Sequence, residues 1–311
     1  MISVVVPVRD EEPSVEPLYR QLVDALDPVG EWEVVYVDDG SADQTFAELV
    51  ALHAAHANVR VVRLRKQLGK AAALDAGLAE AAGTIVVTID GDLQDDPAEI
   101  PKLLAKLDEG FDLVSGWKTT RQDPITRRVP SRLFNAVAGW LSGTHLHDMN
   151  CGLKAFRSEV GEELTLYGEL HRFIPLLAAD RGFRVAEVPV HHRPREHGRS
   201  RYGLERYLRG FLDLLTVVFM SRYRHRPLHL FGGLGLALST VGFLVLSYLT
   251  VLKLTGHAIG GRPLLVLGVL LMVVGIQLLS LGLISELITS HNAERARAEG
   301  RRAPLVDEVL R

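Results

Sequence analysis

The sequence predicts an α/β domain built on a mostly parallel sheet, followed by an amphipathic helix and two membrane-spanning helices. In residues 1–116, short apolar runs alternate with segments of helical periodicity, which is the pattern of βαβ units with helices on both faces of a sheet. Further along, two apolar stretches at about 229–252 and 263–288 are each long enough to cross a hydrocarbon core of ~30 Å. The 311 residues are too many for one ordinary core and suit one globular domain with an appendage.

Strands and helices alternate regularly in the first part of the chain and less regularly after it. Apolar runs predict strands at 2–8, 34–37, 59–64, 84–89 and 111–114, and helical patterns fill the gaps at about 13–26, 43–56, 69–82 and 97–109. Beyond these we expect a loop at 117–130, a helix at 131–142, a strand near 153–156, a helix near 171–180 and a strand at 183–190. Because the first strand follows Met1 directly, no cleavable signal peptide is expected.

An interfacial helix and a membrane hairpin are expected next. Residues 204–223 carry Arg206 and Arg209 against an apolar face, which is typical of a helix lying at a membrane surface. Arginines flank the outer ends of the two apolar stretches, whereas the short loop between them holds only Lys253 and Arg262. The positive-inside rule therefore predicts a multi-pass protein of the inner or plasma membrane, with the globular domain and both termini in the cytoplasm.

Four parts of the chain follow from these patterns. They are a cytoplasmic globular domain at 1–203, a juxtamembrane amphipathic helix at 204–227, a two-helix hairpin at 228–290 and a tail at 291–311. Glu286 lies near the cytoplasmic end of the second span, where an acidic side chain is either functional or a partner for an arginine at the headgroup level.

Charge is unevenly distributed along the chain. Residues 1–116 hold 9 Lys and Arg against 22 Asp and Glu, whereas residues 117–232 hold 19 against 11. A basic segment beside an apolar end indicates anionic headgroups or phosphates as partners. The basic residues are not interleaved with aromatic residues as in nucleic-acid-binding motifs, so no nucleic-acid partner is expected. The single Cys151 excludes an intramolecular disulfide and fits a reducing compartment.

The run at 88–97 is the part of the sequence that carries the most chemistry. It follows a buried strand and places Asp90, Asp92 and Gln94 at the carboxyl end of that strand, the edge of an open α/β sheet where ligands bind. Clustered carboxylate oxygens repel one another unless a cation lies between them, and Mg²⁺ and Mn²⁺ prefer such ligands. We therefore expect these three side chains to hold a divalent metal beside a diphosphate.

Several other patterns have plainer interpretations. Asp95 and Asp96 are expected to cap the helix that begins at 97, since Asp before Pro is a common helix start. The Gly69-Lys70 pair lacks the spacing of a nucleotide-binding P-loop, although Lys70 can still reach a donor phosphate. The glycines at 232–235 lie inside an apolar span and indicate helix packing. The paired histidines at 145/147 and 191/192 lack zinc-site spacing.

Four short sequence elements follow one another in a characteristic order along the chain. They are Val6-Pro7-Val8-Arg9-Asp10-Glu11, Val37-Asp38-Asp39-Gly40-Ser41, Asp90-Gly91-Asp92-Leu93-Gln94 and His197-Gly198-Arg199-Ser200-Arg201-Tyr202. In this order and spacing they resemble glycosyltransferase family 2, specifically the branch of polyprenyl-phosphate glycosyltransferases, over about residues 1–225. The resemblance implies a nucleotide-sugar-binding, GT-A-like fold and an inverting transfer of a single sugar to a lipid phosphate.

The resemblance also implies a set of donor-binding residues. The nucleobase and ribose are expected on Pro7, Arg9, Glu11, Asp38 and Asp39, with Asp90 beside them. A carboxylate can accept hydrogen bonds from the base or ribose, and an Arg can stack on the ring. The alternative for 38–41 is a plain turn with a helix cap. Arg195 and Arg201 are expected to place positive charge over the diphosphate from a loop that orders on binding.

A second set of residues is implied for the acceptor. By similarity Lys118, Arg127 and Ser131 form a clamp for the lipid phosphate, and Asp148 lies beside the reacting groups. The neighbouring arginines at 121, 128 and 132 are expected only to face anionic lipid. Together, Asp92 and Asp148 are the expected catalytic residues, with Asp148 positioning the metal or an Arg.

The expected activity is the transfer of one sugar from a nucleotide-sugar to a membrane polyprenyl phosphate, with Mg²⁺ or Mn²⁺ as cofactor. The two-span layout favours UDP-glucose as donor and leaves GDP-mannose and UDP-N-acetylhexosamine open. Two alternatives remain: another family-2 enzyme such as a processive polysaccharide synthase, or a non-enzymatic membrane scaffold that binds nucleotide-sugars or lipid phosphates. A homo-oligomer, with the tetramer implied by resemblance, is the expected assembly.

Overall fold

The computed structural model describes residues 1–118, 146–148, 151–164, 166, 168, 170–193, 219, 227–260 and 263–298. It divides into two units, Met1–Val217 and Val218–Arg311. The helices expected at 131–142 and, apart from one residue, at 204–223 lie outside the described residues.

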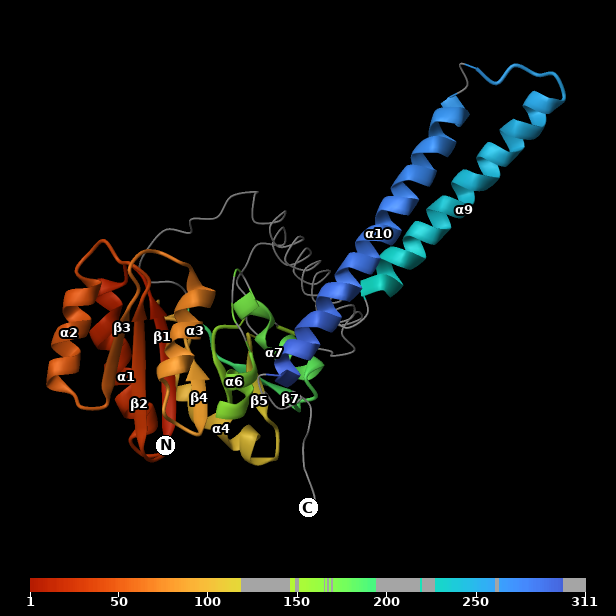
Figure 1. Cartoon of the computed structure of the whole chain (residues 1–311). Coiled ribbons are helices and arrows are strands. Elements are labelled where there is room, and N and C mark those ends of the chain that lie inside the picture. Colours follow the sequence, from red (N-terminus) through yellow and green to blue (C-terminus); the bar gives the residue numbers. More distant parts are fainter. Residues whose placement is uncertain are drawn as a thin grey trace. The chain divides into compact units, whose positions relative to one another are not determined.

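The first unit is built on one seven-stranded sheet of order β3-β2-β1-β4-β6-β5-β7 (Figure 1). The strands are β1 (Ile2–Val8), β2 (Trp32–Asp38), β3 (Val59–Arg63), β4 (Ile85–Thr88), β5 (Leu113–Lys118), β6 (Lys154–Arg157) and β7 (Val185–Val190). β6 runs antiparallel to both β4 and β5, and the other neighbouring pairs are parallel. The mostly parallel sheet predicted from the sequence is confirmed.

Helices cover both faces of this sheet because its inner strands are apolar on both sides. Val4 and Val6 of β1 belong to one core, with α1 (Val15–Leu26), α2 (Thr45–Ala55) and α4 (Ile100–Asp108). Val5, which points the other way, belongs to a second core with α3 (Lys70–Glu80), α6 (Ser158–Glu163) and α7 (Ile174–Asp180). Short 3₁₀ turns precede three of the helices: η1 (Glu12–Ser14), η2 (Pro97–Glu99) and η3 (Leu170–Phe173).

The observed elements differ from the predicted ones at a few boundaries. β5 continues to Lys118, where a loop was expected from 117, because its last residues pair with β7. The helix α6 was not predicted, since six residues are too few for a clear helical period. The expected cap at the start of η2 is present, because a carboxylate oxygen of Asp96 accepts the backbone N–H of Ala98 at 3.1 Å.

The second unit consists of two long helices, α9 (Pro227–Leu254) and α10 (Pro263–Ala298), which pack side by side (Figure 1). Both are long and apolar enough to cross a membrane. In their most apolar 18-residue windows only 17% and 11% of the residues are buried, whereas a core helix of a soluble protein is mostly buried. α10 continues to Ala298, past the expected start of the tail at 291, where the sequence is rich in the strong helix formers Ala, Glu and Arg.

The two long helices approach closely at glycines. A Cβ atom on Gly235 would lie only 2.6 Å from the carbonyl oxygen of Gly275, so these positions accept no side chain without moving a helix. The packing role expected for the glycines at 232–235 is confirmed at Gly235, whereas a Cβ on Gly233 would meet no atom within 4 Å. Glu286 has a structural partner, since one of its carboxylate oxygens accepts the backbone N–H of Leu228 at 3.2 Å, in the first turn of α9.

Replacing Gly235 by Leu is expected to loosen the helix pair, because forcing a side chain into a filled contact costs about 1–3 kcal/mol. Gly233→Leu is the matched control, since a Cβ there meets no atom within 4 Å. The measurement is the thermal loss of helical circular dichroism in detergent micelles. Gly235→Leu should melt several degrees below Gly233→Leu, and equal melting temperatures would show that the glycine contact does not hold the helices together.

Candidate active site

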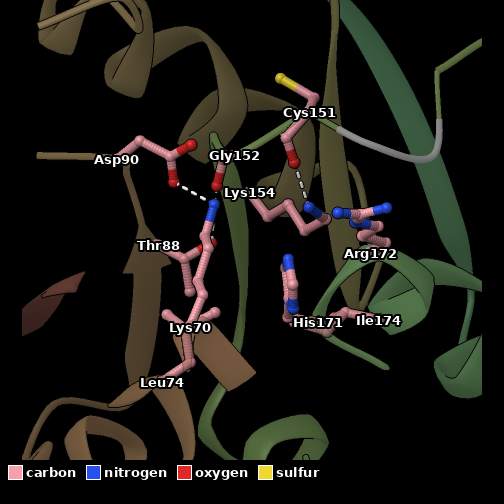
Figure 2. A pocket seen from close by; sticks show the side chains of 10 residues that line it. All are labelled: Lys70, Leu74, Thr88, Asp90, Cys151, Gly152, Lys154, His171, Arg172 and Ile174. Atoms are coloured by element: carbon pink, nitrogen blue, oxygen red, sulfur yellow. Dashed lines mark hydrogen bonds and ion pairs between the residues drawn. The ribbon is translucent and has the colours of Figure 1, made fainter. Parts of the chain in front are cut away.

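A pocket opens at the carboxyl end of β4, on the face of the sheet that α3 and α7 cover (Figure 2). Val86 of β4 lies in the core on that face, and Thr88 and Asp90 follow it at two-residue intervals. The hydroxyl of Thr88 donates a hydrogen bond to the carbonyl oxygen of Gly152 at 2.9 Å. The lining residues are Lys70, Leu74, Thr88, Asp90, Cys151, Gly152, Lys154, His171, Arg172 and Ile174.

The antiparallel strand β6 brings a distant segment onto Asp90. β6 pairs with β4 so that Lys154 lies opposite Thr88, and Gly152 therefore lies beside Asp90. A Cβ on Gly152 would lie 2.7 Å from the carboxylate carbon of Asp90 and 2.6 Å from an oxygen of Asp95. Only glycine lets the backbone come this close, so the segment around Gly152 lies directly against the turn that holds Asp90.

Lys70 supplies the cation nearest to Asp90. It is the first residue of α3, and its ammonium donates a hydrogen bond to one carboxylate oxygen of Asp90. The sequence pattern gave Lys70 only a secondary role, yet the structure places it at the centre of the pocket. Its charge offsets that of Asp90, as a metal ion at this carboxylate would.

The predicted metal ligands Asp92 and Gln94 lie in a tight turn after β4. An Asp92 oxygen accepts the backbone N–H of Gln94 at 3.2 Å, and Leu93 between them has a positive φ of 61°. Such backbone conformations are uncommon for residues other than Gly and cluster at functional sites. Among the described residues no group of three or more His, Cys, Asp and Glu is placed to hold a metal. Two carboxylates do fit an ion such as Mg²⁺ that takes its remaining ligands from phosphates and water.

The first two elements of the resemblance form interlocked loops after β1 and β2. The backbone N–H of Asp10, which has a φ of 53°, donates to the hydroxyl of Ser41 at 3.0 Å. The backbone N–H of Glu11 donates to the hydroxyl of Thr45 at 2.9 Å. Pro7 lies at the end of β1, opposite Val37 of β2. Pro7, Arg9 and Glu11 are half-buried along this edge of the sheet, so the structure brings these predicted donor residues together.

Asp38 and Asp39 are engaged within the loops themselves. Asp38 is fully buried, accepts the backbone N–H of Ser41 at 3.0 Å and pairs with Arg63 at 3.6 Å. Asp39 accepts the backbone N–H groups of Leu68 and Gly69 at 2.7 and 3.0 Å. These contacts match the turn that was the alternative interpretation of this motif, and they fix the chain leading into α3.

The backbone of Asp148 is held by the side chain of Glu187, which comes from β7. Glu187 accepts the backbone N–H groups of His147 and Asp148 at 2.7 and 3.0 Å, and Asp148 itself is only 1% exposed. Nearby, burial raises the pKa of the Cys151 thiol to about 12, so this thiol stays neutral at physiological pH. The backbone at His147 and Asp148 is therefore tied to β7.

Lys118 forms a buried ion pair with Asp95, and His192 lies beside the same carboxylate. The Lys118 ammonium lies 3.1 Å from an Asp95 oxygen, and His192 Nδ1 lies 3.3 Å from the same atom. Burial alone would raise the pKa of Asp95, but its contacts with His192 and Lys118 outweigh it and hold that pKa below the ordinary range. Asp95, expected only to cap a helix, is thus a structural anchor.

Sequence reasoning missed some residues of this region and named others that lie outside the described residues. Arg127, Ser131, Arg195 and Arg201 belong to the latter group. His171 and Arg172 were missed, although two basic residues at the start of an otherwise apolar helix are a signal that could have found them. Glu187 and His192 were missed because their partners are distant in sequence.

Comparisons with known proteins identify the family of the chain. The model of the family "Glycosyl transferase family 2" matches residues 3–165. The chain is 40% identical to dodecaprenyl-phosphate galacturonate synthase of Rhizobium johnstonii, over 92% of this chain and 87% of that protein. It is 38% identical to undecaprenyl-phosphate 4-deoxy-4-formamido-L-arabinose transferase of Pseudomonas aeruginosa, over 92% of this chain and 84% of that protein.

Solved structures show the same fold. Glucosyl-3-phosphoglycerate synthase from Mycobacterium tuberculosis, in complex with Mn²⁺, uridine diphosphate and phosphoglyceric acid, superposes with a TM-score of 0.54. That likeness covers 71% of this chain and 78% of the other, at 23% sequence identity. The two chains therefore share a fold, and the match of the family model to more than half of the sequence shows that the chain belongs to glycosyl transferase family 2.

Proposed function

We propose that this protein transfers one sugar from a nucleotide-sugar to a polyprenyl phosphate in the membrane. The observation that carries the proposal is the contact between the Asp90–Gln94 turn and the segment around Gly152, in a chain that also has two membrane-length helices. Relatives 38–40% identical over nine-tenths of the chain are named for sugar transfer to dodecaprenyl or undecaprenyl phosphate, which supports the same acceptor class here.

The residues of the pocket have separate tasks in this reaction. Asp90 and Asp92, with Gln94 beside them, would hold a divalent ion, Mg²⁺ or Mn²⁺, which when bound stabilises the charge of the departing diphosphate. Lys70 places a further positive charge at the same edge of the sheet. The acceptor phosphate is already largely ionised at pH 7, so no general base is needed and Asp148 serves to position neighbouring groups. Attack from the face opposite the diphosphate inverts the anomeric configuration.

The remaining binding residues are assigned by family resemblance. Pro7, Arg9, Glu11, Asp38 and Asp39 are proposed to border the nucleoside. Pro7, Arg9 and Glu11 are half-buried along this edge of the sheet, which supports the proposal, and Asp38 and Asp39 are buried at the end of β2. Arg195 and Arg201 are proposed over the diphosphate. Lys118, Arg127 and Ser131 are proposed for the acceptor phosphate, although Lys118 also has an internal partner in Asp95.

The names of the relatives bear on the identity of the donor sugar. UDP-glucose was the donor favoured from sequence, but the two relatives described above are named for galacturonate and for 4-deoxy-4-formamido-L-arabinose. These names give UDP-glucose no support. Sugars modified at one carbon are therefore the first donors to test, with UDP-glucose, GDP-mannose and UDP-N-acetylhexosamine as comparisons.

The membrane arrangement is also a proposal. The arginines that flank the hairpin, at 222–226 and 295–302, favour a cytoplasmic site for the globular domain and both termini. The parts proposed are a globular domain at 1–203, an interfacial helix at 204–227 and a hairpin at 228–290. We also propose that the protein self-associates through the hairpin, for example as a tetramer.

Asp92→Asn is expected to reduce lipid-linked sugar synthesis about a hundredfold or more, because a metal ligand would be lost without a change in side-chain volume. The assay incubates purified protein with labelled nucleotide-sugars, Mg²⁺ or Mn²⁺ and polyprenyl phosphate, followed by lipid extraction. Asp108→Asn, an exposed substitution on α4, is the control and should be fully active. Full activity of Asp92→Asn would refute the metal assignment, and no labelled lipid with any donor would favour a binding scaffold.

Gly152→Ala is expected to lower the same activity at least tenfold, because the added methyl would displace the carboxylate of Asp90. Gly161→Ala is the matched control, since its Cβ would make only ordinary contacts of 3.4 Å or more. Both variants are compared by initial rate and by melting temperature. Wild-type activity in Gly152→Ala would show that the position of Asp90 is not critical.

Lys118→Met separates the two roles of Lys118. If the ammonium mainly neutralises buried Asp95, its loss leaves an unpaired buried charge and lowers stability by about 3–5 kcal/mol. We expect this result in thermal or denaturant unfolding. Unchanged stability together with a raised KM for polyprenyl phosphate would instead assign Lys118 to the acceptor clamp.

A further inference from the structure

A polar side chain lies at the middle of the second membrane-length helix. Gln277 of α10 comes 14 residues after Pro263 and 12 residues before Thr289, the two ends of the apolar span. At a rise of 1.5 Å per residue it lies about 18 to 21 Å from either end, near the centre of a hydrocarbon core of ~30 Å. No water reaches an amide at that depth, so its hydrogen bonds must come from protein.

Gln277 points away from α9. Gly268, Gly275 and Gly282 form the side of α10 that packs on α9, because a Cβ on each would meet an α9 side chain at 3.0 Å or less. Successive helix residues are about 100° apart, so Gln277, two positions after Gly275, lies on the opposite side of the helix. We call this side the outer face of α10; its members are all exposed and are Leu270, Val273, Gln277, Ser280, Leu281, Ile284 and Ile288.

The amide of Gln277 differs from the hydroxyls of the hairpin in having no partner. Thr240, Thr250 and Thr289 each donate to the carbonyl oxygen four residues earlier in their own helix, at 2.8, 2.8 and 2.9 Å. Within the described part of the chain no hydrogen bond satisfies the side chain of Gln277. Since an unsatisfied polar group in hydrocarbon is costly, this amide calls for a polar atom of another molecule at the same depth.

A second copy of the chain supplies such an atom by symmetry. Two copies inserted in the same direction carry Gln277 at the same depth, and a two-fold axis along the membrane normal turns the same helix face of each copy towards the other. A carboxamide both donates and accepts, so two of them can bond to each other reciprocally. Acyl chains offer no hydrogen bond, and lipid headgroups lie far from the centre of the bilayer.

We propose, on the basis of the membrane arrangement proposed above, that two copies of this chain associate through the outer face of α10, with the Gln277 amides of the two copies hydrogen-bonded to each other. The apolar residues of the same face, such as Val273 and Ile284, pack around this bond. The glycine contacts between α9 and α10 hold one hairpin together, whereas the outer face joins two hairpins.

The first test measures association directly. Energy transfer between donor- and acceptor-labelled full-length protein is followed in lipid vesicles over a range of protein-to-lipid ratios, without substrates. Gln277→Leu should weaken association about fivefold to thirtyfold, which is what one hydrogen bond between membrane helices contributes. Gln277→Asn keeps an amide and should lose less. Thr240→Val, on the exposed side of α9, is the control and should associate like the wild type, because its hydroxyl bonds only to its own helix.

The second test maps the face by disulfide formation in membranes. The native Cys151 is buried and lies outside the hairpin, so the wild type should not cross-link. Ile284→Cys, two turns from Gln277 on the outer face, should form a dimer under mild oxidation. Leu283→Cys is the matched control, because Leu283 and Ile284 are 59% and 55% exposed but Leu283 lies about 120° from Gln277 around the helix. Adding Gln277→Leu to Ile284→Cys should reduce the cross-link.

Several results would overturn the inference. They are a wild-type protein that stays monomeric in vesicles, equal association of Gln277→Leu and wild type, and equal cross-linking at 283 and 284. If Gln277→Leu associates normally but transfers less sugar, Gln277 serves the lipid acceptor and the inference is wrong. Because association is measured without substrates, it stands apart from catalysis: a protein that pairs through Gln277 but makes no lipid-linked sugar would refute only the proposed transfer.

Discussion

The antiparallel pairing of β6 with β4 is the constraint on which the candidate site depends. It places Lys154 opposite Thr88, and thereby sets the backbone of Gly152 against the carboxylate of Asp90. Without this pairing, the acidic turn after β4 would be an ordinary polar loop at the edge of a parallel sheet. The parallel strands on one side supply the acidic groups, and the antiparallel strand supplies a close backbone approach and a buried cation. Both contributions are needed before the edge of the sheet becomes a pocket.

Local patterns in the sequence were sufficient to predict the strands and helices in the first half of the fold. The strands β1 to β4 and the helices between them follow from apolar runs and helical periods, because each βαβ unit buries its own surface within a few tens of residues. The place of β6 between β4 and β5 does not follow from such patterns. It depends on pairing between residues about 70 positions apart, and strand 154–157 by itself is short and begins and ends with charged residues.

The acidic residues illustrate the same limit at the level of the site. Asp38, Asp39 and Asp95 are as conspicuous in the sequence as Asp90 and Asp92, yet the structure satisfies them internally with backbone N–H groups, Arg63 or Lys118. Each buried carboxylate must have such partners, because an unpaired one is costly. Residue type and spacing predicted where the carboxylates gather. Only long-range contacts show which of these carboxylates, such as Asp38, Asp39 and Asp95, also hold loops together.

The alternation of side chains between the two faces of the sheet explains why opposite charges meet in one pocket. On β4, Val86 and Thr88 share the α3-facing side of the sheet, and Asp90 continues this alternation beyond the last strand residue. On β6, Lys154 and Phe156 occupy that same side, while Leu153 and Ala155 pack into the other core. A shift of one residue in the β4–β6 register would turn Lys154 towards the apolar core and move Gly152 away from Asp90. Because Leu153, Ala155 and Phe156 are all fully buried, the hydrophobic cores forbid that shift, and the packing of the sheet therefore fixes the electrostatics of the pocket.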